Sequence, residues 1–170
     1  DYSIRASKAG LHSLVEKPLA TTREECEAMI AAAEAGKVWL MTAYRLHNEP
    51  ATLEVSEMIR RGEIGDPRIF TATLAFNIPA GNHRLLARHW GGALQDIGVY
   101  CLNAARHVFQ SEPEAVAAFE GWGNNDPRFA EVPETVSVTL MFPGGRIANF
   151  HASFGTGMVA YAAFLMRICD

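Results

Sequence analysis

The chain has 170 residues, which suffices for one ordinary domain or for pieces of two, but is short for an enzyme with complete cofactor and substrate domains. Its content of 49% apolar and 20% charged residues excludes disorder as the dominant state. The net charge is -4 without any basic run, which argues against a nucleic-acid partner. The longest apolar run, Met158 to Met166, is far shorter than the roughly 20 residues of a membrane helix, and no signal sequence opens the chain, so no membrane partner is expected.

The cysteines and histidines favour neither a disulfide framework nor a metal site. The cysteines are Cys26, Cys101 and Cys169, an odd number without C-x-x-C spacing. No two histidines stand four apart on a helix with a glutamate between them, so no metal is expected. This cysteine usage fits a reducing, cytoplasmic compartment.

Residues 1–43 alternate between helical and strand patterns. A helix is predicted over residues 2–9, and the apolar run 13–15 has the length of one buried parallel strand. Thr21 and Thr22 each precede a glutamate by three residues, the spacing of a capping box, and apolar residues then recur at helical intervals up to the next glycine. The run 38–43 predicts a second strand. This order is typical of a parallel sheet with crossover helices.

The pattern changes after residue 47. Asn48 is predicted to cap a helix with Pro50 in its first turn, and the buried stripe of that helix is predicted as Leu53, Val55, Met58 and Ile59. Alternation with a period of two then predicts a strand over residues 68–76. The following stretch, 77–92, lacks periodicity, and connections of that length are often functional.

The rest of the chain predicts an α+β arrangement. A helix is expected over residues 94–109, followed by strands at 115–120, 135–142 and 146–154, the last two joined by a Pro-Gly-Gly hairpin. Apolar and polar residues alternate in 135–142, which predicts a sheet with one face on the core and the other open to water or a partner. The predicted fold class is therefore α/β followed by α+β.

A first candidate site follows the first predicted strand. Glu16, Lys17 and Pro18 lie just past its carboxyl end, the edge at which open α/β sheets place their ligands. A lysine there can reach a bound hydroxyl. An ordinary surface lysine before a loop proline would give the same sequence, so both interpretations stand at this point.

A second candidate site lies on the helix at 94–109. Asp96 and Tyr100 are four residues apart, so a carboxylate and a phenol share one face, which Asn103 and His107 continue. A phenol can give or take a proton, and a nearby ammonium such as that of Lys17 favours the phenolate. Alternatively, the carboxylate only complements the helix N-terminus and the phenol is a half-buried aromatic with a satisfied hydroxyl.

The dinucleotide fingerprint G-x-G-x-x-G is absent from the sequence. The nearest approach is Gly121-Trp122-Gly123, but Asp126 replaces the third glycine and begins an Asp-Pro turn where the motif requires a helix. Cys101 falls on the apolar side of its helix, which favours a core position over a nucleophile.

Several segments together resemble one enzyme family. They are Ile4 to Gly10, Glu16-Lys17-Pro18-Leu19-Ala20, Ala43 to His47, Gly62-Glu63-Ile64-Gly65, and the glycine-led run Gly91 to Tyr100. In this order the chain is similar to the glucose-fructose oxidoreductase, inositol dehydrogenase and rhizopine-catabolism family (Gfo/Idh/MocA), up to about residue 157. Tyrosine at position 100 resembles the glucose-fructose oxidoreductase branch.

The resemblance implies a domain plan. Residues 1–47 would be the C-terminal part of an NAD(P)-binding Rossmann domain, lacking its amino-terminal portion. Residues 48–170 would be an incomplete substrate-binding and oligomerisation domain with an open-faced, mostly antiparallel sheet and helices on one face, which would join subunits into a homo-oligomer. The loop residues Arg88-His89-Trp90 depart from the family, where a further glycine is usual, and the tail after Gly157 matches nothing.

The resemblance also implies roles for residues. Lys17 matches the catalytic lysine, Asp96 the substrate-binding carboxylate, and Tyr100 the general acid/base. Glu16, Lys17, Pro18, Tyr44 and Arg45 would contact NAD or NADP, which is otherwise bound by residues outside this chain, and the Lys17-Pro18 peptide bond would be cis.

The expected function is hydride transfer between NAD(P) and a hydroxyl-bearing carbon of a sugar or polyol. The alternative is a non-catalytic sugar-sensing or scaffold relative with the same fold. Residues 1–170 alone are expected neither to bind the cofactor tightly nor to turn over substrate, because a pyrophosphate needs backbone N–H groups after a glycine turn.

Overall fold

The computed structural model describes residues 1–123, 125–156 and 161–169, the last of these as backbone only. The chain divides into two compact units, Asp1–Leu53 and Glu54–Asp170. The predicted boundary between residues 47 and 48 separates two domains of the family rather than these compact units, and it stays a prediction.

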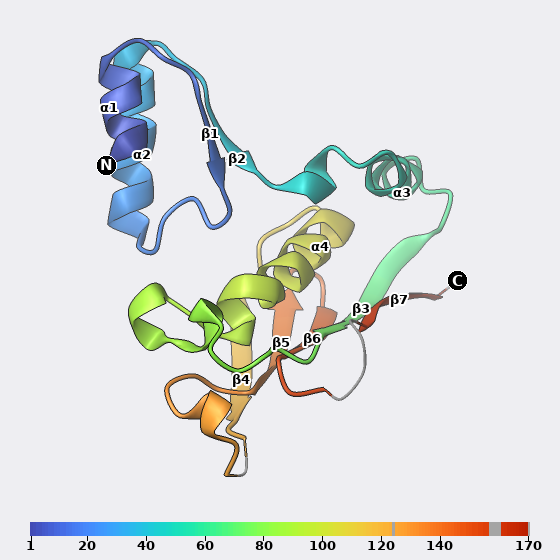
Figure 1. Cartoon of the computed structure of the whole chain (residues 1–170). Helices are drawn as coiled ribbons and strands as arrows, with labels where there is room; N and C mark the ends of the chain where they lie inside the picture. The colour runs from blue at the N-terminus through green and yellow to red at the C-terminus, as the bar shows by residue number, and fades with distance from the viewer. Residues whose placement is uncertain (124, 157–160, 170) are drawn as a thin grey trace. The chain divides into compact units, whose positions relative to one another are not determined.

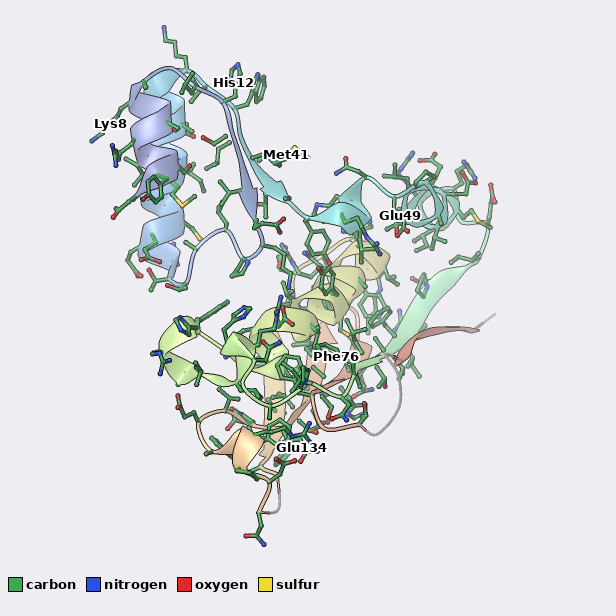
Figure 2. All side chains as sticks on the ribbon, viewed as in Figure 1. Lys8, His12, Met41, Glu49, Phe76 and Glu134 are labelled. Carbon is green, nitrogen blue, oxygen red and sulfur yellow. The ribbon has the colours of Figure 1, made fainter. Side chains whose placement is uncertain are left out.

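The first unit is the predicted α/β piece. Helices α1 (Tyr2–Lys8) and α2 (Arg23–Gly36) lie side by side next to a sheet of two strands (Figure 1). Strands β1 (Ser13–Glu16) and β2 (Leu40–Ala43) pair in parallel, which confirms the expected order of helices and parallel strands in this segment. The strands are joined across their amino-terminal side by His12, labelled in Figure 2, whose Nδ1 accepts the backbone N–H of Trp39 at 2.9 Å.

Helix α2 begins with the predicted capping box. The hydroxyl of Thr22 accepts the backbone N–H of Glu25 at 3.2 Å, and the Glu25 carboxylate accepts the backbone N–H of Thr22 at 3.3 Å. Hydrogen bonds from Thr21, above all that of its hydroxyl, also hold the pKa of Glu25 below its usual value. At the other end of the helix, a Cβ at Gly36 would lie 2.4 Å from the carbonyl oxygen of Ser7, so this position must lack a side chain for α1 and α2 to approach.

Helix α3 spans Pro50–Arg60, as its sequence predicts, but the prediction of a buried stripe along it is wrong. None of its residues is buried, and Leu53 and Val55 are about half exposed. The reason is that no described helix or strand packs closely along α3, so its apolar face has no covering layer among the described residues.

A mixed sheet of five strands dominates the second unit. In space the strands follow the order β4-β5-β6-β3-β7. Their bounds are Asp66–Ala75 for β3, Ala115–Gly121 for β4, Thr135–Phe142 for β5, Arg146–Ser153 for β6 and Tyr161–Cys169 for β7. The pair β3 and β6 is parallel and the other neighbours are antiparallel, which confirms the expected mostly antiparallel sheet.

Strand β7 is an addition to the sequence-based prediction, which left the tail after residue 157 unassigned. Its backbone pairs with β3 along the whole length of that strand. Its sequence contains aromatic and β-branched residues of the kind favoured in strands, so composition alone could have indicated it. Residues 157–160 and Asp170 of the same tail lie outside the described residues.

Helix α4 (Val99–Phe109) covers one face of this sheet over β3 and β6 (Figure 1). The core between them is apolar and aromatic, and the rings of Phe109 and Phe142 meet edge to face with centroids 4.9 Å apart. Its buried members are Phe70, Ala72, Cys101, Ala105, Phe109, Val136, Val138, Leu140, Phe142, Ala148 and Phe150. The buried residues of β5 are the ones that its alternation predicts.

A second apolar cluster supports the long segment between β3 and α4. It contains Ile78, Leu85, Ala93, Ile97, Phe129, Val132, Ala152 and Phe154. Phe76, labelled in Figure 2, packs against it, with its ring 5.1 Å from that of Phe154. The segment itself forms two short 3₁₀ turns, His83–Leu85 and Ala87–His89, and is therefore an ordered, anchored loop.

The opposite face of the sheet carries a row of exposed apolar side chains. Met141 of β5 lies opposite Ile147 of β6, and Ile147 lies opposite Ile69 of β3, so the three side chains share one face in register. All three are more than a third exposed. Phe119 of the edge strand β4 lies on the same face opposite Ser137 and is 78% exposed.

Candidate functional site

The ends of β1 and β2 bring the first set of predicted residues to one edge. Glu16, the last residue of β1, lies opposite Ala43, the last residue of β2, in parallel register. Lys17-Pro18 and Tyr44-Arg45 therefore leave the sheet at the same edge, the one where α/β sheets hold ligands. The Lys17-Pro18 peptide bond is cis, so that prediction is confirmed.

Tyr44 is fixed by its surroundings at this edge. It is buried, its backbone N–H donates to the carbonyl of Thr42 at 2.8 Å, and its ring centroid lies 4.4 Å from that of His47. Arg45 opens the 3₁₀ turn Arg45–His47 that brings the histidine under this ring. The first unit thus gathers Glu16, Lys17, Pro18, Tyr44 and Arg45 at one place, and their contact with a cofactor stays a prediction.

The second set of predicted residues lies where the helix over β3 and β6 begins. Asp96 lies in a π-helical turn, Leu94–Gly98, and Tyr100 lies in the first turn of α4. The helix predicted over residues 94–109 is therefore confirmed, and its first turn is π-helical. A Cβ on Gly98 would lie 2.8 Å from Cδ1 of Leu94, so a side chain here would have to displace that leucine, whereas its contact with Cβ of Ala152 in β6, at 3.5 Å, would be an ordinary one. Single π turns inside helices are frequent at functional sites.

Asp96 forms an ion pair that its sequence did not indicate. The guanidinium Nε of Arg84 lies 3.0 Å from Oδ2 of the carboxylate. The Asp96 side chain is 17% exposed and that of Arg84 40%, so the pair is partly shielded from water. The backbone N–H of Asp96 also donates to the carbonyl of Gly92 at 3.1 Å, which ties the residue to the start of its helix.

The loop that carries Arg84 closes onto the glycine pair before the helix. The N–H of Gly92 donates to the carbonyl of Arg84 at 2.9 Å, and the N–H of Gly91 donates to the carbonyl of Leu86 at 3.2 Å. A Cβ at Gly91 would lie 2.4 Å from the Arg84 carbonyl oxygen, so this closure requires glycine. The glycine pair was the available sequence signal for such a loop, but nothing in the spacing singled out Arg84.

Trp90 ends the stretch Arg88-His89-Trp90, in which the resemblance leads one to expect a further glycine. Its backbone is left-handed, with φ 55° and ψ 38°, a conformation that costs a residue with a Cβ about 1–2 kcal/mol. The loop thus keeps a turn suited to glycine despite the bulky side chain. The backbone strain at Trp90 is therefore local to this residue.

The buried thiol of Cys101 confirms the predicted core position. It lies within the apolar core, and burial raises its pKa to about 12. A thiol that stays protonated is a poor nucleophile. Among the described residues, no group of three His, Cys, Asp or Glu side chains could hold a metal ion.

Lys17 belongs to the first unit, whereas Asp96 and Tyr100 belong to the second. None of the three side chains is without an interaction partner. Their convergence on one substrate hydroxyl remains a prediction.

Sequence comparison assigns both units. Residues 52–161 match the GFO/IDH/MocA C-terminal domain, and residues 1–44 match the NAD-binding Rossmann fold of the oxidoreductase family. The chain belongs to the Gfo/Idh/MocA oxidoreductase family. The predicted resemblance and the predicted fold class are both confirmed.

The similar curated proteins of this family include dehydrogenases of small hydroxylated compounds. The chain is 33% identical over 156 residues to the trans-1,2-dihydrobenzene-1,2-diol dehydrogenase of Mus musculus, covering 88% of this chain and 44% of the relative. It is 35% identical over 138 residues to the D-xylose 1-dehydrogenase (NADP+) of Haloarcula marismortui, and the similarity covers 77% of this chain and 38% of that relative.

A similar solved structure is the aldose-aldose oxidoreductase of Caulobacter crescentus complexed with glycerol. Its sequence is 38% identical to this chain and its TM-score is 0.85. The similarity covers 91% of this chain and 47% of the chain in that structure. The Gfo/Idh/MocA chain described here therefore spans less than half the length of these relatives. No helix in the described parts of the chain has the length and apolarity needed to cross a membrane.

Proposed function

We propose that the protein containing this chain transfers a hydride between NAD or NADP and a hydroxyl-bearing carbon of a sugar or polyol. The observation that carries the proposal is the placement of three groups on the family fold. A lysine follows β1 at the ligand edge of its sheet, and a carboxylate and a phenol lie four residues apart where a helix begins. A protein that only senses a sugar needs no acid/base at this place, so the set favours an enzyme.

In the proposed reaction each side chain has one task. Tyr100 takes the proton from the substrate hydroxyl through its phenolate oxygen while the carbon loses its hydride, and returns the proton in the reverse direction. The ammonium of Lys17 favours the phenolate and orients that hydroxyl. Asp96 accepts a hydrogen bond from a neighbouring substrate hydroxyl, which holds the reacting carbon in place.

The residues at the end of β1 and β2 suit the nicotinamide end of a dinucleotide. They offer an ammonium, a guanidinium and a buried aromatic ring at the edge where parallel strands end. When bound, NAD(P) supplies the hydride acceptor or donor. Glu16, Lys17, Pro18, Tyr44 and Arg45 would line that end of the cofactor.

The test uses the natural protein that contains this chain together with its complete cofactor domain. It is assayed with NAD+ and NADP+ against a panel of aldoses and polyols, with reduced nicotinamide as the signal. Lys17→Met and Tyr100→Phe should each lower kcat by about 10²–10⁴-fold, the contribution of a positioned acid/base. The exposed residue Lys8 supplies a matched control, because Lys8→Met makes the same chemical change at a lysine outside the proposed site.

Binding of a panel sugar without turnover of any would instead support the non-catalytic sugar sensor. Residues 1–170 alone form a further comparison, in a calorimetric titration with NADH and NADPH. Micromolar affinity of this piece would contradict the placement of the pyrophosphate site outside it.

We also propose that the open face of the sheet joins two copies of the protein. Its row of Ile69, Met141 and Ile147 is apolar and in register, which is the self-complementary kind of surface that a two-fold dimer buries. Replacing Met141 by aspartate should convert a dimer to a monomer in light-scattering measurements. An unchanged mass would place the interface elsewhere.

A further inference from the structure

A second segment of the chain holds the loop that carries Arg84. This substrate loop, residues 82–92, comes between β3 and α4, whereas the bracing segment, residues 126–132, comes between β4 and β5. The bracing segment contains the 3₁₀ turn Pro127–Phe129, drawn in orange below the green substrate loop in Figure 1. Buried residues of both segments belong to the second apolar cluster, so the two segments pack on a common support.

Glu131 of the bracing segment contacts the substrate loop directly. Its Oε2 accepts the backbone N–H of Ala87 at 3.0 Å. Ala87 is the first residue of the 3₁₀ turn Ala87–His89, and the first N–H groups of a helical turn have no partner within it. The Glu131 carboxylate therefore caps a turn that lies 44 residues away in the sequence.

Arg128 ties the bracing segment to the start of the substrate loop. Its Nη1 donates to Oδ1 of Asn77 at 2.6 Å and to the carbonyl of Ile78 at 2.7 Å, just after the end of β3. Its Nε and Nη2 donate to the carboxylate of Asp126, which keeps the guanidinium in this orientation. Bonds between charged partners are about twice as strong as neutral ones, so Glu131 projects from a firmly held segment.

The turn that Glu131 caps is strained. Trp90, which follows it, has a left-handed backbone with φ 55°, a conformation unfavourable for a residue with a Cβ. Such a conformation persists only where the surrounding structure holds it in place. The N–H of Trp90 donates to the carbonyl of Ala87 at 2.9 Å, so Glu131 and Trp90 bind the two polar backbone groups of one residue. The hydrogen bond from Ala87 to Glu131 thus helps to offset the strain.

We propose that Glu131 is a positioning residue of the substrate site, which acts by holding the substrate loop in its strained, closed form. In this form Nε of Arg84 lies 3.0 Å from Oδ2 of Asp96, and the carbonyl of Gly92 accepts the backbone N–H of Asp96 at 3.1 Å. Without the brace a smaller fraction of molecules has the loop closed, and the apparent substrate affinity falls with that fraction. The inference rests on the proposed function, because it takes Asp96 as a group that binds substrate.

The experiment uses variants of the natural protein with its complete cofactor domain. Glu131 is exposed, so Glu131→Ala removes the acceptor without leaving a cavity, whereas Glu131→Gln keeps an oxygen that can accept the N–H of Ala87. Glu120→Ala, at an exposed carboxylate of β4, is the matched control. Trypsin cleavage after Arg88, an exposed residue of the loop, measures loop opening. Cleavage after Lys37, exposed in the first unit, is the internal reference.

Glu131→Ala should speed cleavage after Arg88 about fivefold, as expected when one hydrogen bond is lost. It should raise KM for the better substrate of D-xylose and D-glucose by a similar factor, with a smaller change in kcat. Glu131→Gln should recover most of both effects, and Glu120→Ala should show neither. Glycine adopts positive φ freely, so Glu131→Ala combined with Trp90→Gly should restore slow cleavage.

Three results would overturn the proposal. Unchanged cleavage after Arg88 in Glu131→Ala would show that the loop needs no brace. Faster cleavage with unchanged KM and unchanged D-xylose affinity would show that the contact supports only the fold. Fast cleavage that persists in the double variant with Trp90→Gly would show that Glu131 does not act against the strain.

The outcome stays distinguishable from that of the proposed function. If the wild-type protein binds D-xylose calorimetrically but oxidises no sugar, hydride transfer is refuted, and about fivefold weaker binding by Glu131→Ala still supports the assignment. Equal binding by both proteins overturns it, as does failure of the wild-type protein to bind either sugar.

Discussion

Replacement of Gly91 by alanine tests whether the closed loop before the helix has the geometry described above. The added Cβ would lie 2.4 Å from the carbonyl oxygen of Arg84 and 2.8 Å from that of Leu86. Both neighbours are backbone atoms, so no side-chain rotation can relieve the contact, and the loop itself must move.

The magnitude follows from two contributions. Overpacking of a well-packed site costs about 1–3 kcal/mol. Movement of the loop would also weaken two backbone hydrogen bonds, Gly91 to Leu86 and Gly92 to Arg84, each with a net value of about 1 kcal/mol. We therefore expect Gly91→Ala to lower the free energy of unfolding by about 2–4 kcal/mol.

Urea unfolding monitored by tryptophan fluorescence measures this change. Gly121→Ala is the matched control, since its Cβ would meet Thr135 only at 3.7 Å, an ordinary contact. In an exposed edge strand that substitution should be neutral or slightly stabilising. If Gly91→Ala unfolds within about 0.5 kcal/mol of the wild-type protein, the loop is not closed as described, and the anchoring of Arg84 fails with it.

Three further substitutions test other parts of the fold. The Cys101 thiol has a pKa near its ordinary value of 9.0 in the unfolded chain and of about 12 in the folded one. Its contribution to stability is therefore complete below pH 9 and declines as the pH rises toward 12. Urea unfolding should give a lower free energy of unfolding at about pH 10 than at about pH 8, and Cys101→Ala should lack this decrease. Thr22→Ala should destabilise α2 by about 1 kcal/mol, read as lost helical circular dichroism, and an unchanged signal would refute the capping role. Phe142→Ala should cost about 3–5 kcal/mol by calorimetry, and a loss under 1 kcal/mol would contradict its place in the core.

Local patterns predicted most of the elements because their causes are local. The capping residues of α2, the alternation in β5 and the Pro-Gly-Gly hairpin each depend on a few neighbouring side chains. The exposed stripe of α3 could not be predicted this way, since periodicity shows that a face is apolar but not what covers it. Strand β7 was left unassigned although its aromatic and β-branched residues favour a strand.

The sequence likewise indicated some features of the candidate site and not others. Asp96 and Tyr100 were proposed because their spacing of four is readable on any helix, and Lys17 because it follows a strand; their roles stay predictions. The π turn at Leu94–Gly98 was not readable, since nothing in the spacing of the residues distinguishes it from an α-helical turn. Arg84 was missed because its contact with the carboxylate exists only once the loop has folded back.

The parallel pairing of β3 with β6 has a consequence for synthesis on the ribosome. Ile69 pairs with Ile147, so β3 has left the exit tunnel long before either of its sheet neighbours has been translated. Until then its apolar residues and unpaired backbone are open to other nascent chains, and contacts of such sequence separation also form slowly. Expression at lower temperature or with a chaperone that shields strands should therefore raise the yield of native protein more than stabilising the first unit would.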